Sequence, residues 1–286
     1  MRQGTITLLA LTLALTGCAA SGPYDRFAGY VDVNGLHTYY ERCGRGPPLV
    51  LLHGAAMGAE GWRSQTSALQ RHFTVYVPER RGARRSVDVV GEWSYAGMAA
   101  DTATFMDTIK INDAAVVGLG DGGIIALILA YSRPELVSRL VVSGANNNPA
   151  GLAAIEGELE HMTPEEFLAG VPSHDVPWLE MHRRVSPDRG QQILGAFAEV
   201  KRMRVDCEIA PSQLARISAP TLVMVGDDDM IPVSHAVEMW ASVPDAKLCV
   251  VPDAGHFWLQ EKPELANRII LDFLLASDSG ATSSRR

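Results

Sequence analysis

Two side chains that can work together as a base and its orienting acid stand after late, strand-like runs of this sequence. An acid among residues 227–229 (DDD) follows the apolar run at residues 221–225, and His256 follows the run at residues 248–251. A carboxylate that accepts a hydrogen bond from one imidazole nitrogen leaves the other nitrogen free to take up a proton. The spacing therefore indicates general-base or nucleophilic catalysis, provided that the fold brings both residues to one place.

A glycine-rich turn stands earlier, where such chemistry needs a nucleophile. Residues 114–117 (AAVV) suit a buried strand and residues 124–130 suit a buried helix, so residues 118–122 (GLGDG) predict a tight strand-to-helix turn. In the nucleophile elbow G-x-S-x-G, the central serine hydroxyl projects above the sheet. Here Gly120 occupies the apex, and the turn carries no hydroxyl.

The same glycines raise a second interpretation, a dinucleotide site. Gly118, Gly120 and Gly123 satisfy G-x-G-x-x-G between a strand and a helix. That site needs an acidic residue about twenty positions later, but the next strand ends in residues 144–146 (GAN). Asp121 would also place negative charge where a pyrophosphate should bind. The sequence therefore disfavours a nucleotide site, and Asp121 is otherwise a favourable acid at a helix start.

The elements that must position these residues form an α/β pattern. Asn34-Gly35 between two β-rich runs predicts a hairpin. Further strand-like runs then alternate with helical segments, which predicts a mostly parallel sheet with helices on both faces. The strand-like runs are residues 30–33, 36–40, 49–52, 74–77, 114–117, 140–143, 221–225 and 248–251. Ligands of such sheets bind beyond the carboxyl ends of the strands, where residues 227–229 and His256 fall.

With these motifs in place, residues 27–277 resemble the α/β-hydrolase superfamily, in its esterase-like branch. The resemblance is carried by His53-Gly54, by the glycine turn and by the chain order of the acid and the histidine. It implies an α/β-hydrolase fold with a helical cap inserted at about residues 148–212. It also implies a site in which Asp229 is the triad acid and His256 the triad base.

The resemblance further implies an oxyanion hole formed by the backbone N–H groups of Ala55 and Asp121. Residues 79–86 (ERRGARRS) resemble the family loop D-x-R-G-x-G-x-S, with Glu79 for aspartate and Arg84 for glycine. His53 is expected to support its turn rather than to act as a base.

The sequence does not decide which of three consecutive acids contacts His256, because Asp227 and Asp228 compete with Asp229 for that role. The same cluster has oxygen ligands that suit a divalent cation. Adjacent carboxylates in one turn more often point apart into solvent, so we expect neither a metal ion nor a cofactor.

Glycine at the apex leaves three hypotheses for the site. In the first, His256, oriented by Asp229, activates a water that attacks a carbonyl held by the oxyanion N–H groups. In the second, Asp121 is an ester-forming nucleophile, although a residue one position from the apex is turned by about 100° around the helix axis. In the third, the protein binds a small ligand without catalysis. We expect a weak or unusual hydrolase of a small, mostly apolar ester-type substrate, with the binding protein as the alternative.

The N-terminal segment predicts a location outside the cytoplasm. Residues 1–17 combine Arg2, an apolar stretch and a small-residue ending, which is typical of a signal peptide. Residues 15–18 (LTGC) resemble the bacterial lipobox, which implies lipidation of Cys18 and anchoring to a bacterial membrane. A plain secretory signal is the alternative. Residues 18–26 would be a tether, and residues 278–286 a frayed tail.

Composition and cysteine usage limit the other function classes. The chain of 286 residues has a formal net charge of −8, which argues against nucleic acid and against electrostatic docking to anionic lipid. The expected partners are a small-molecule substrate or ligand and the membrane, through Cys18. With Cys18 lipidated, Cys43, Cys207 and Cys249 remain, so at least one of them cannot pair within the chain.

Overall fold

The structure of the protein is a computed structural model that describes most of the predicted hydrolase region. The predicted signal peptide, Cys18, most of the tether, much of the predicted cap and the tail lie outside the described residues. The described residues are 25–55, 57–88, 91, 93–153, 157, 161–163, 166, 178–189, 191, 194, 198, 201, 203–204 and 207–277.

Strands and helices alternate along the described chain, as the sequence predicts. The strands are β1 (Arg26–Val33), β2 (Leu36–Gly44), β3 (Pro48–Leu52), β4 (Thr74–Pro78), β5 (Ala114–Leu119), β6 (Val137–Ser143), β7 (Thr221–Gly226) and β8 (Ala246–Val251). The α-helices are α1 (Arg63–Leu69), α2 (Tyr95–Thr108), α3 (Asp121–Ser132), α6 (Trp178–Val185), α9 (Pro211–Leu214), α10 (Val233–Ser242), α11 (Trp258–Glu261) and α12 (Pro263–Leu274). Short 3-10 helices are η1 (Ala59–Trp62), η2 (Pro134–Leu136) and η3 (Pro149–Leu152).

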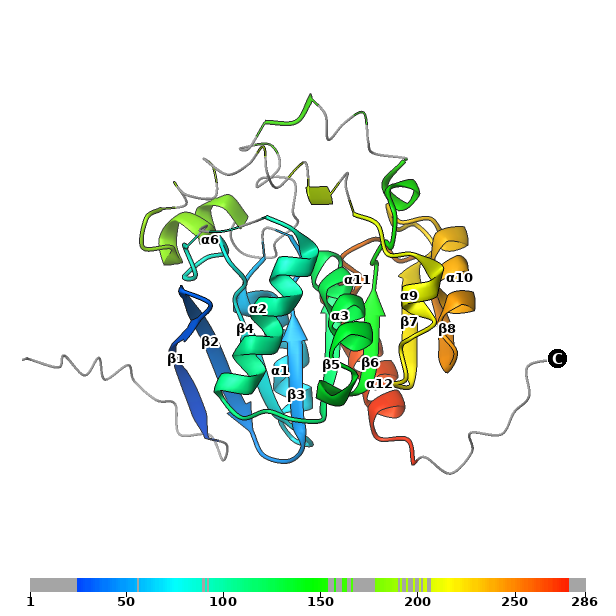
Figure 1. Ribbon diagram of the computed structural model, residues 1–286, viewed down its shortest axis with the longest axis horizontal. Helices are drawn as coiled ribbons and strands as arrows, with labels where there is room; N and C mark the ends of the chain where they lie inside the picture. The colour runs from blue at the N-terminus through cyan, green and yellow to red at the C-terminus, as the bar shows by residue number, and fades with distance from the viewer. Residues whose placement is uncertain are drawn as a thin grey trace, which may run out of the picture.

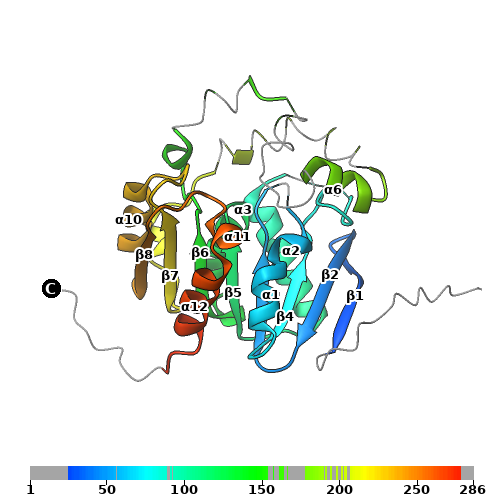
Figure 2. The same cartoon turned by 180° about the vertical axis from the view of Figure 1, so that it is seen from behind.

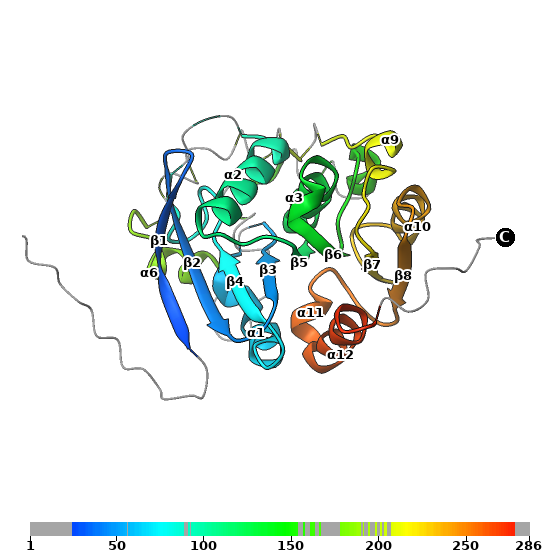
Figure 3. The same ribbon diagram turned by 60° about the horizontal axis from the view of Figure 1, so that its bottom comes forward.

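One eight-stranded sheet organises the described residues, in the order β1-β2-β4-β3-β5-β6-β7-β8. The pairs β1 with β2 and β2 with β4 are antiparallel, and every other pair is parallel. Helices α2, α3 and α10 cover one face, and α1, α11 and α12 cover the other (Figures 1, 2 and 3). The predicted α/β-hydrolase fold, with a mostly parallel sheet and helices on both faces, is confirmed.

The predicted hairpin is present but longer than its sequence signal. Asn34 and Gly35 both have positive φ, 51° and 79°, as a tight turn between antiparallel strands requires. β1 begins at Arg26, four residues before the predicted run, because its antiparallel pairing continues from the turn out to Cys43 on β2. β1 lies at the edge of the sheet and is largely exposed, so its outer half carries no alternating apolar pattern.

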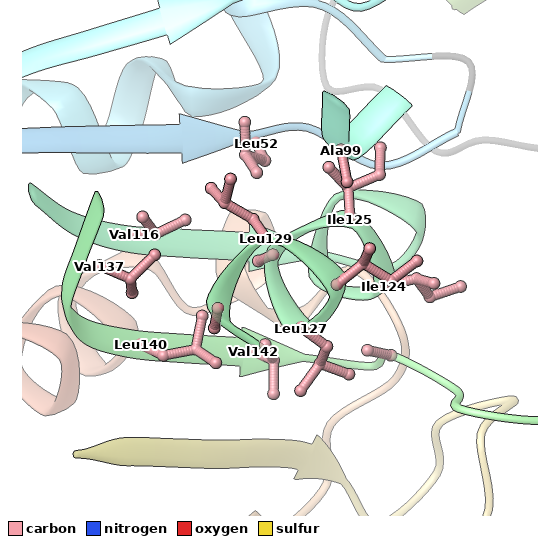
Figure 4. Packing of buried hydrophobic residues seen from close by; sticks show 14 of the residues in the cluster. Leu52, Ala99, Val116, Ile124, Ile125, Leu127, Leu129, Val137, Leu140 and Val142 are labelled. Atoms are coloured by element: carbon pink, nitrogen blue, oxygen red, sulfur yellow. The ribbon is translucent and has the colours of Figure 1, made fainter. Parts of the chain in front are cut away.

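The central strands divide their side chains between two cores. Along β5, Val116 packs under α2 and α3, whereas Val117 and Leu119 pack on the face that α11 and α12 cover. This alternation between two buried faces explains why the strand is apolar without interruption. Figure 4 shows the first core, in which Leu129 of α3 lies near Leu52 of β3 and Val116 of β5.

Helix α3 lies deep in this core, and its first turn touches the backbone of β3. A Cβ on Gly122 would lie 2.0 Å from the carbonyl oxygen of Leu52, so only glycine permits this approach. The contact brings the end of β3 and the start of α3 together. These are the two segments expected to supply the oxyanion hole.

Cys43, Cys207 and Cys249 are free thiols in the structure. Burial raises the pKa of Cys207 to about 12, with a smaller contribution from Asp121. No helix among the described residues combines the length and apolar character needed to cross a membrane.

Candidate active site

Asp229 and His256 form a buried hydrogen-bonded pair at the carboxyl ends of β7 and β8. The Nδ1 atom of His256 lies 2.8 Å from Asp229 Oδ1, and the carboxylate is fully buried. The backbone N–H of Ile231 donates to the same oxygen at 2.9 Å, which fixes the carboxylate in place. With Nδ1–H donating to the acid, Nε2 of the neutral ring is free to accept a proton.

The structure resolves which of the three consecutive acids contacts the histidine. Asp227 is exposed, and its Oδ1 accepts the backbone N–H of Ala254 at 3.1 Å, a bond that lowers the pKa of Asp227. Asp228 is exposed as well, and only Asp229 turns inward to His256. In the described part of the chain, no three His, Cys, Asp or Glu side chains are grouped to hold a metal ion.

Gly144, directly after β6, lies against this pair and was not singled out for the site from the sequence. A Cβ on Gly144 would lie 2.8 Å from His256 Nδ1 and 2.9 Å from Asp229 Oδ2. Its φ of 57° is also one that glycine adopts without cost. The glycine therefore makes room for the imidazole and the carboxylate to meet above the sheet.

Gly120 stands at the apex of the predicted turn, opposite the other nitrogen of the imidazole. Its φ of 53° and ψ of −120° are outside the usual regions for residues with side chains, so glycine adopts without strain the backbone expected of an elbow apex. A Cβ on Gly120 would lie 3.1 Å from His256 Nε2 and 3.9 Å from Gly54 Cα. The structure thus brings Gly120, His256 and Asp229 together in one row.

The two predicted oxyanion donors lie on the segments that flank this row. Ala55 follows β3, and Asp121 is the first residue of α3. The N–H groups in the first turn of a helix have no carbonyl partner within the helix, so the N–H of Asp121 is free of the α3 ladder. The helix dipole adds partial positive charge at the same end.

The side chain of Asp121 is held inside the protein, pointing to partners other than His256. Arg80 Nη1 donates to Oδ2 at 2.9 Å, while Arg204 Nη2 and Tyr95 Oη donate to Oδ1 at 3.0 Å each. Burial alone would raise the pKa of Asp121, but the charges of Arg204 and Arg80 outweigh it and hold the pKa well below its ordinary value. This pairing leaves no carboxylate oxygen directed at the row of Gly120 and His256.

His53 is a structural histidine, as expected. Its Nδ1 lies 2.8 Å from the carbonyl oxygen of Gly54, and its Nε2 accepts the backbone N–H of Arg80 at 3.2 Å. Burial, reinforced by the charge of Arg80, lowers the pKa of His53 to about 3. The ring is therefore neutral, with a proton on Nδ1 and an acceptor at Nε2.

In the loop at residues 79–86, the two residues that differ from the family pattern, Glu79 and Arg84, both have partners inside the protein. Arg84, in place of glycine, keeps the left-handed backbone that glycine favours, with φ at 51°. Its fully buried Nε lies 2.6 Å from Glu60 Oε1. Glu79, in place of aspartate, is fully buried and accepts the backbone N–H groups of Ala59 and Arg85.

Sequence reasoning found the acid, the histidine and the apex but missed the partners of Asp121. Tyr95 is the first residue of α2, Arg80 follows β4, and Arg204 comes from the region of the predicted cap. Nothing in the local sequence around Arg204 connects it with a residue 83 positions earlier. Arg80 belongs to the loop at residues 79–86, which follows β4. Its position at the end of a strand was the only sequence feature that could have placed it near the site.

Comparisons with known proteins bear on the fold and the family of the chain. The model of the alpha/beta hydrolase family matches residues 49–268. The putative carbamate hydrolase RutD of Azorhizobium caulinodans is 29% identical over 254 residues, which cover 82% of this chain and 94% of that protein. The 2-hydroxy-6-oxo-6-phenylhexa-2,4-dienoate hydrolase of Burkholderia cepacia is 28% identical over 261 residues, covering 81% and 88%. The structure of a meta-cleavage product hydrolase from Pseudomonas fluorescens IP01 superposes with a TM-score of 0.74 at 22% identity, covering 87% of this chain and 97% of the other.

Proposed function

The chain belongs to the alpha/beta hydrolase family, and from this premise we propose that it hydrolyses a small ester or related acyl substrate without a covalent intermediate. His256, oriented by Asp229, takes a proton from a water molecule beside Gly120. The resulting hydroxide attacks the carbonyl carbon, and the N–H groups of Ala55 and Asp121 stabilise the oxyanion that forms. The imidazolium then returns the proton to the leaving oxygen as the tetrahedral intermediate collapses.

One observation carries this proposal. The point where a Cβ on Gly120 would stand lies 3.1 Å from His256 Nε2, which is a hydrogen-bond distance for a water oxygen. A serine would place a carbon atom there and its hydroxyl farther out. Because glycine places nothing there, the base faces a space next to the elbow, in line with Asp229.

The rate expected of this site is low. Removing the serine of a triad costs around a million-fold in kcat in a well-studied serine protease, yet roughly a thousand-fold acceleration over water remains from oxyanion donors and binding. The names of the curated relatives, a carbamate hydrolase and a dienoate hydrolase, are consistent with a small substrate that carries an activated carbonyl group. We propose a mostly apolar substrate of this kind.

The test is a panel of fluorogenic short-chain esters and carbamates, hydrolysed by the native protein, His256→Ala and Gly120→Ser. The proposal predicts slow turnover by the native protein that His256→Ala abolishes. If turnover appears only in Gly120→Ser, the hydrolase proposal is wrong and the second candidate takes its place.

That second candidate is a protein that binds a small ligand in the same site without catalysis. Gly120 favours it, because a binding protein has no use for a nucleophile. Asp229 and His256 count against it, because binding alone does not require a buried acid behind an imidazole.

We also propose that the protein is lipidated at Cys18 and anchored to a bacterial membrane outside the cytoplasm. The support is the sequence of residues 1–18, with its apolar stretch and its lipobox-like ending. Expression of Cys18→Ala in a bacterial host tests the proposal. The native protein should partition with membranes and incorporate labelled fatty acid, whereas the variant should do neither.

A further inference from the structure

Arg80 makes two hydrogen bonds that reach opposite sides of the proposed oxyanion hole. Its backbone N–H donates to His53 Nε2 at 3.2 Å, and its guanidinium donates to Asp121 Oδ2 at 2.9 Å. His53 lies two residues before Ala55, and Asp121 carries the second N–H itself. A single residue thus joins both donor segments.

The link to the first segment depends on a neutral His53. Its Nε2 can accept the N–H of Arg80 only without a proton, and burial lowers the pKa of this imidazole to about 3. Its other nitrogen lies 2.8 Å from the carbonyl oxygen of Gly54, the residue immediately before the donor. The ring therefore transmits the position of the Arg80 backbone to the Gly54-Ala55 peptide.

The link to the second segment is equally constrained. The side chains of Arg80 and Asp121 are largely buried, 16% and 6% exposed, so water competes little for their hydrogen bond. Tyr95 and Arg204 hold the other carboxylate oxygen from two further parts of the chain. With both oxygens held, the first peptide of α3 has little freedom to rotate.

We propose that Arg80 is a positioning residue that sets the separation of the Ala55 and Asp121 N–H groups. This inference rests on the proposed function, since it concerns the oxyanion hole of the same site. A misplacement of about 1 Å in a catalytic group can cost roughly a hundred-fold in rate, so a residue that fixes both donors at once affects kcat more than substrate binding.

Two substitutions separate positioning from simple electrostatic stabilisation. Arg80→Gln makes the site less positive, and Asp121→Asn makes it more positive while keeping the backbone N–H. Positioning predicts that both lower kcat at least ten-fold with KM within two-fold, and that Arg80→Lys recovers most of the loss. Electrostatic stabilisation of the oxyanion alone predicts effects of opposite sign, which would overturn the proposal. The exposed pair of Arg133→Gln and Asp107→Asn provides matched charge changes that should leave kcat unchanged.

Each variant is measured in the native and the Gly120→Ser backgrounds, with thermal unfolding to confirm that it is folded. Activity that occurs only in the Gly120→Ser background contradicts the proposed function. If Arg80→Gln and Asp121→Asn lower kcat as predicted in that background, the role of Arg80 is still supported. Turnover that neither substitution alters overturns the role of Arg80 and leaves the proposed function intact.

Binding of a short alkylphosphonate monoester, a tetrahedral anion, gives a readout without turnover. Calorimetry should show weaker binding in both Arg80→Gln and Asp121→Asn than in the native protein. If neither the native nor the Gly120→Ser background has activity, this binding measurement alone tests the role of Arg80. Equal affinity in all three proteins, or no binding by the native protein, contradicts the proposal.

Discussion

Asp229 holds the Nδ1 atom of His256 at 2.8 Å, while the opposite nitrogen of the ring faces the glycine at the apex of the elbow. The proposed acid, the proposed base and the glycine turn thus lie together around Gly120. The chemistry that we propose follows from this arrangement.

Asp229→Asn is expected to lower kcat by roughly 10²- to 10⁴-fold, because an amide no longer selects the imidazole tautomer whose Nε2 accepts a proton. The measurement is steady-state hydrolysis of the best ester in the panel. Asp228→Asn is the matched control, since it makes the same change on the exposed neighbour. Similar losses in both variants would show that general charge, rather than the buried pair, supports catalysis.

Gly144→Ala is expected to displace His256 and reduce activity at least ten-fold, because the new methyl group would stand 2.8 Å from Nδ1. Gly35→Ala is the control, since Gly35 also has positive φ but has no heavy atom within 4 Å of the added Cβ. Both variants should lose about 1–3 kcal/mol of unfolding free energy to backbone strain. Full activity in Gly144→Ala would mean that the pair tolerates movement and is not pre-organised.

Gly120→Ser is expected to create a serine nucleophile that reacts with a fluorophosphonate probe. The imidazole must yield by a few tenths of an ångström, because the new Cβ would lie 3.1 Å from Nε2. The strained φ of 53° should lower the unfolding free energy by about 1–3 kcal/mol. Adding His256→Ala should abolish labelling, and labelling that survives in this double variant would place the reactive group elsewhere.

Acid should destabilise the protein through His53. The unfolded chain takes up this proton near pH 6.5, whereas the folded protein resists it until about pH 3, so the unfolded state binds more protons between these values. The stabilisation is complete above pH 6.5 and is lost as the pH falls towards 3, at up to about 1.4 kcal/mol per pH unit.

Urea unfolding of the native protein and His53→Gln from pH 7.5 to pH 4 tests this dependence. The variant should show a shallower loss of unfolding free energy, and His72→Gln, on the exposed surface, should behave like the native protein. If the unfolding free energies of the native protein and His53→Gln fell in parallel with pH, His53 would not be the source of the acid sensitivity.

The buried centre of the fold was predictable from the sequence, whereas the edge hairpin was predictable in its turn but not in its full length. β5 is buried on both faces, so its apolar run is unbroken, whereas β1 lies at an exposed edge and its outer half has no pattern to read. The acid and the histidine were found because strand ends meet at one edge of a parallel sheet. The choice of Asp229 over its two neighbours matched the family position, but the contact itself needed coordinates.

The support around the site depended on long-range contacts. Arg84 adopts a left-handed backbone without being glycine, and Glu60 pairs with its buried guanidinium. Arg204 reaches Asp121 across 83 positions of chain. Neither contact has a local signal, since both arise from packing between segments that the sequence leaves far apart.

The central claim is that water, activated by His256 beside Gly120, attacks the substrate directly. Rapid mixing of the native protein with a fluorogenic short-chain ester, followed by intact mass measurement during turnover, tests it most directly. The account predicts a linear release of the fluorescent alcohol from the first turnover and a protein of unchanged mass. A burst equal to the protein concentration, together with an acylated chain, would contradict it.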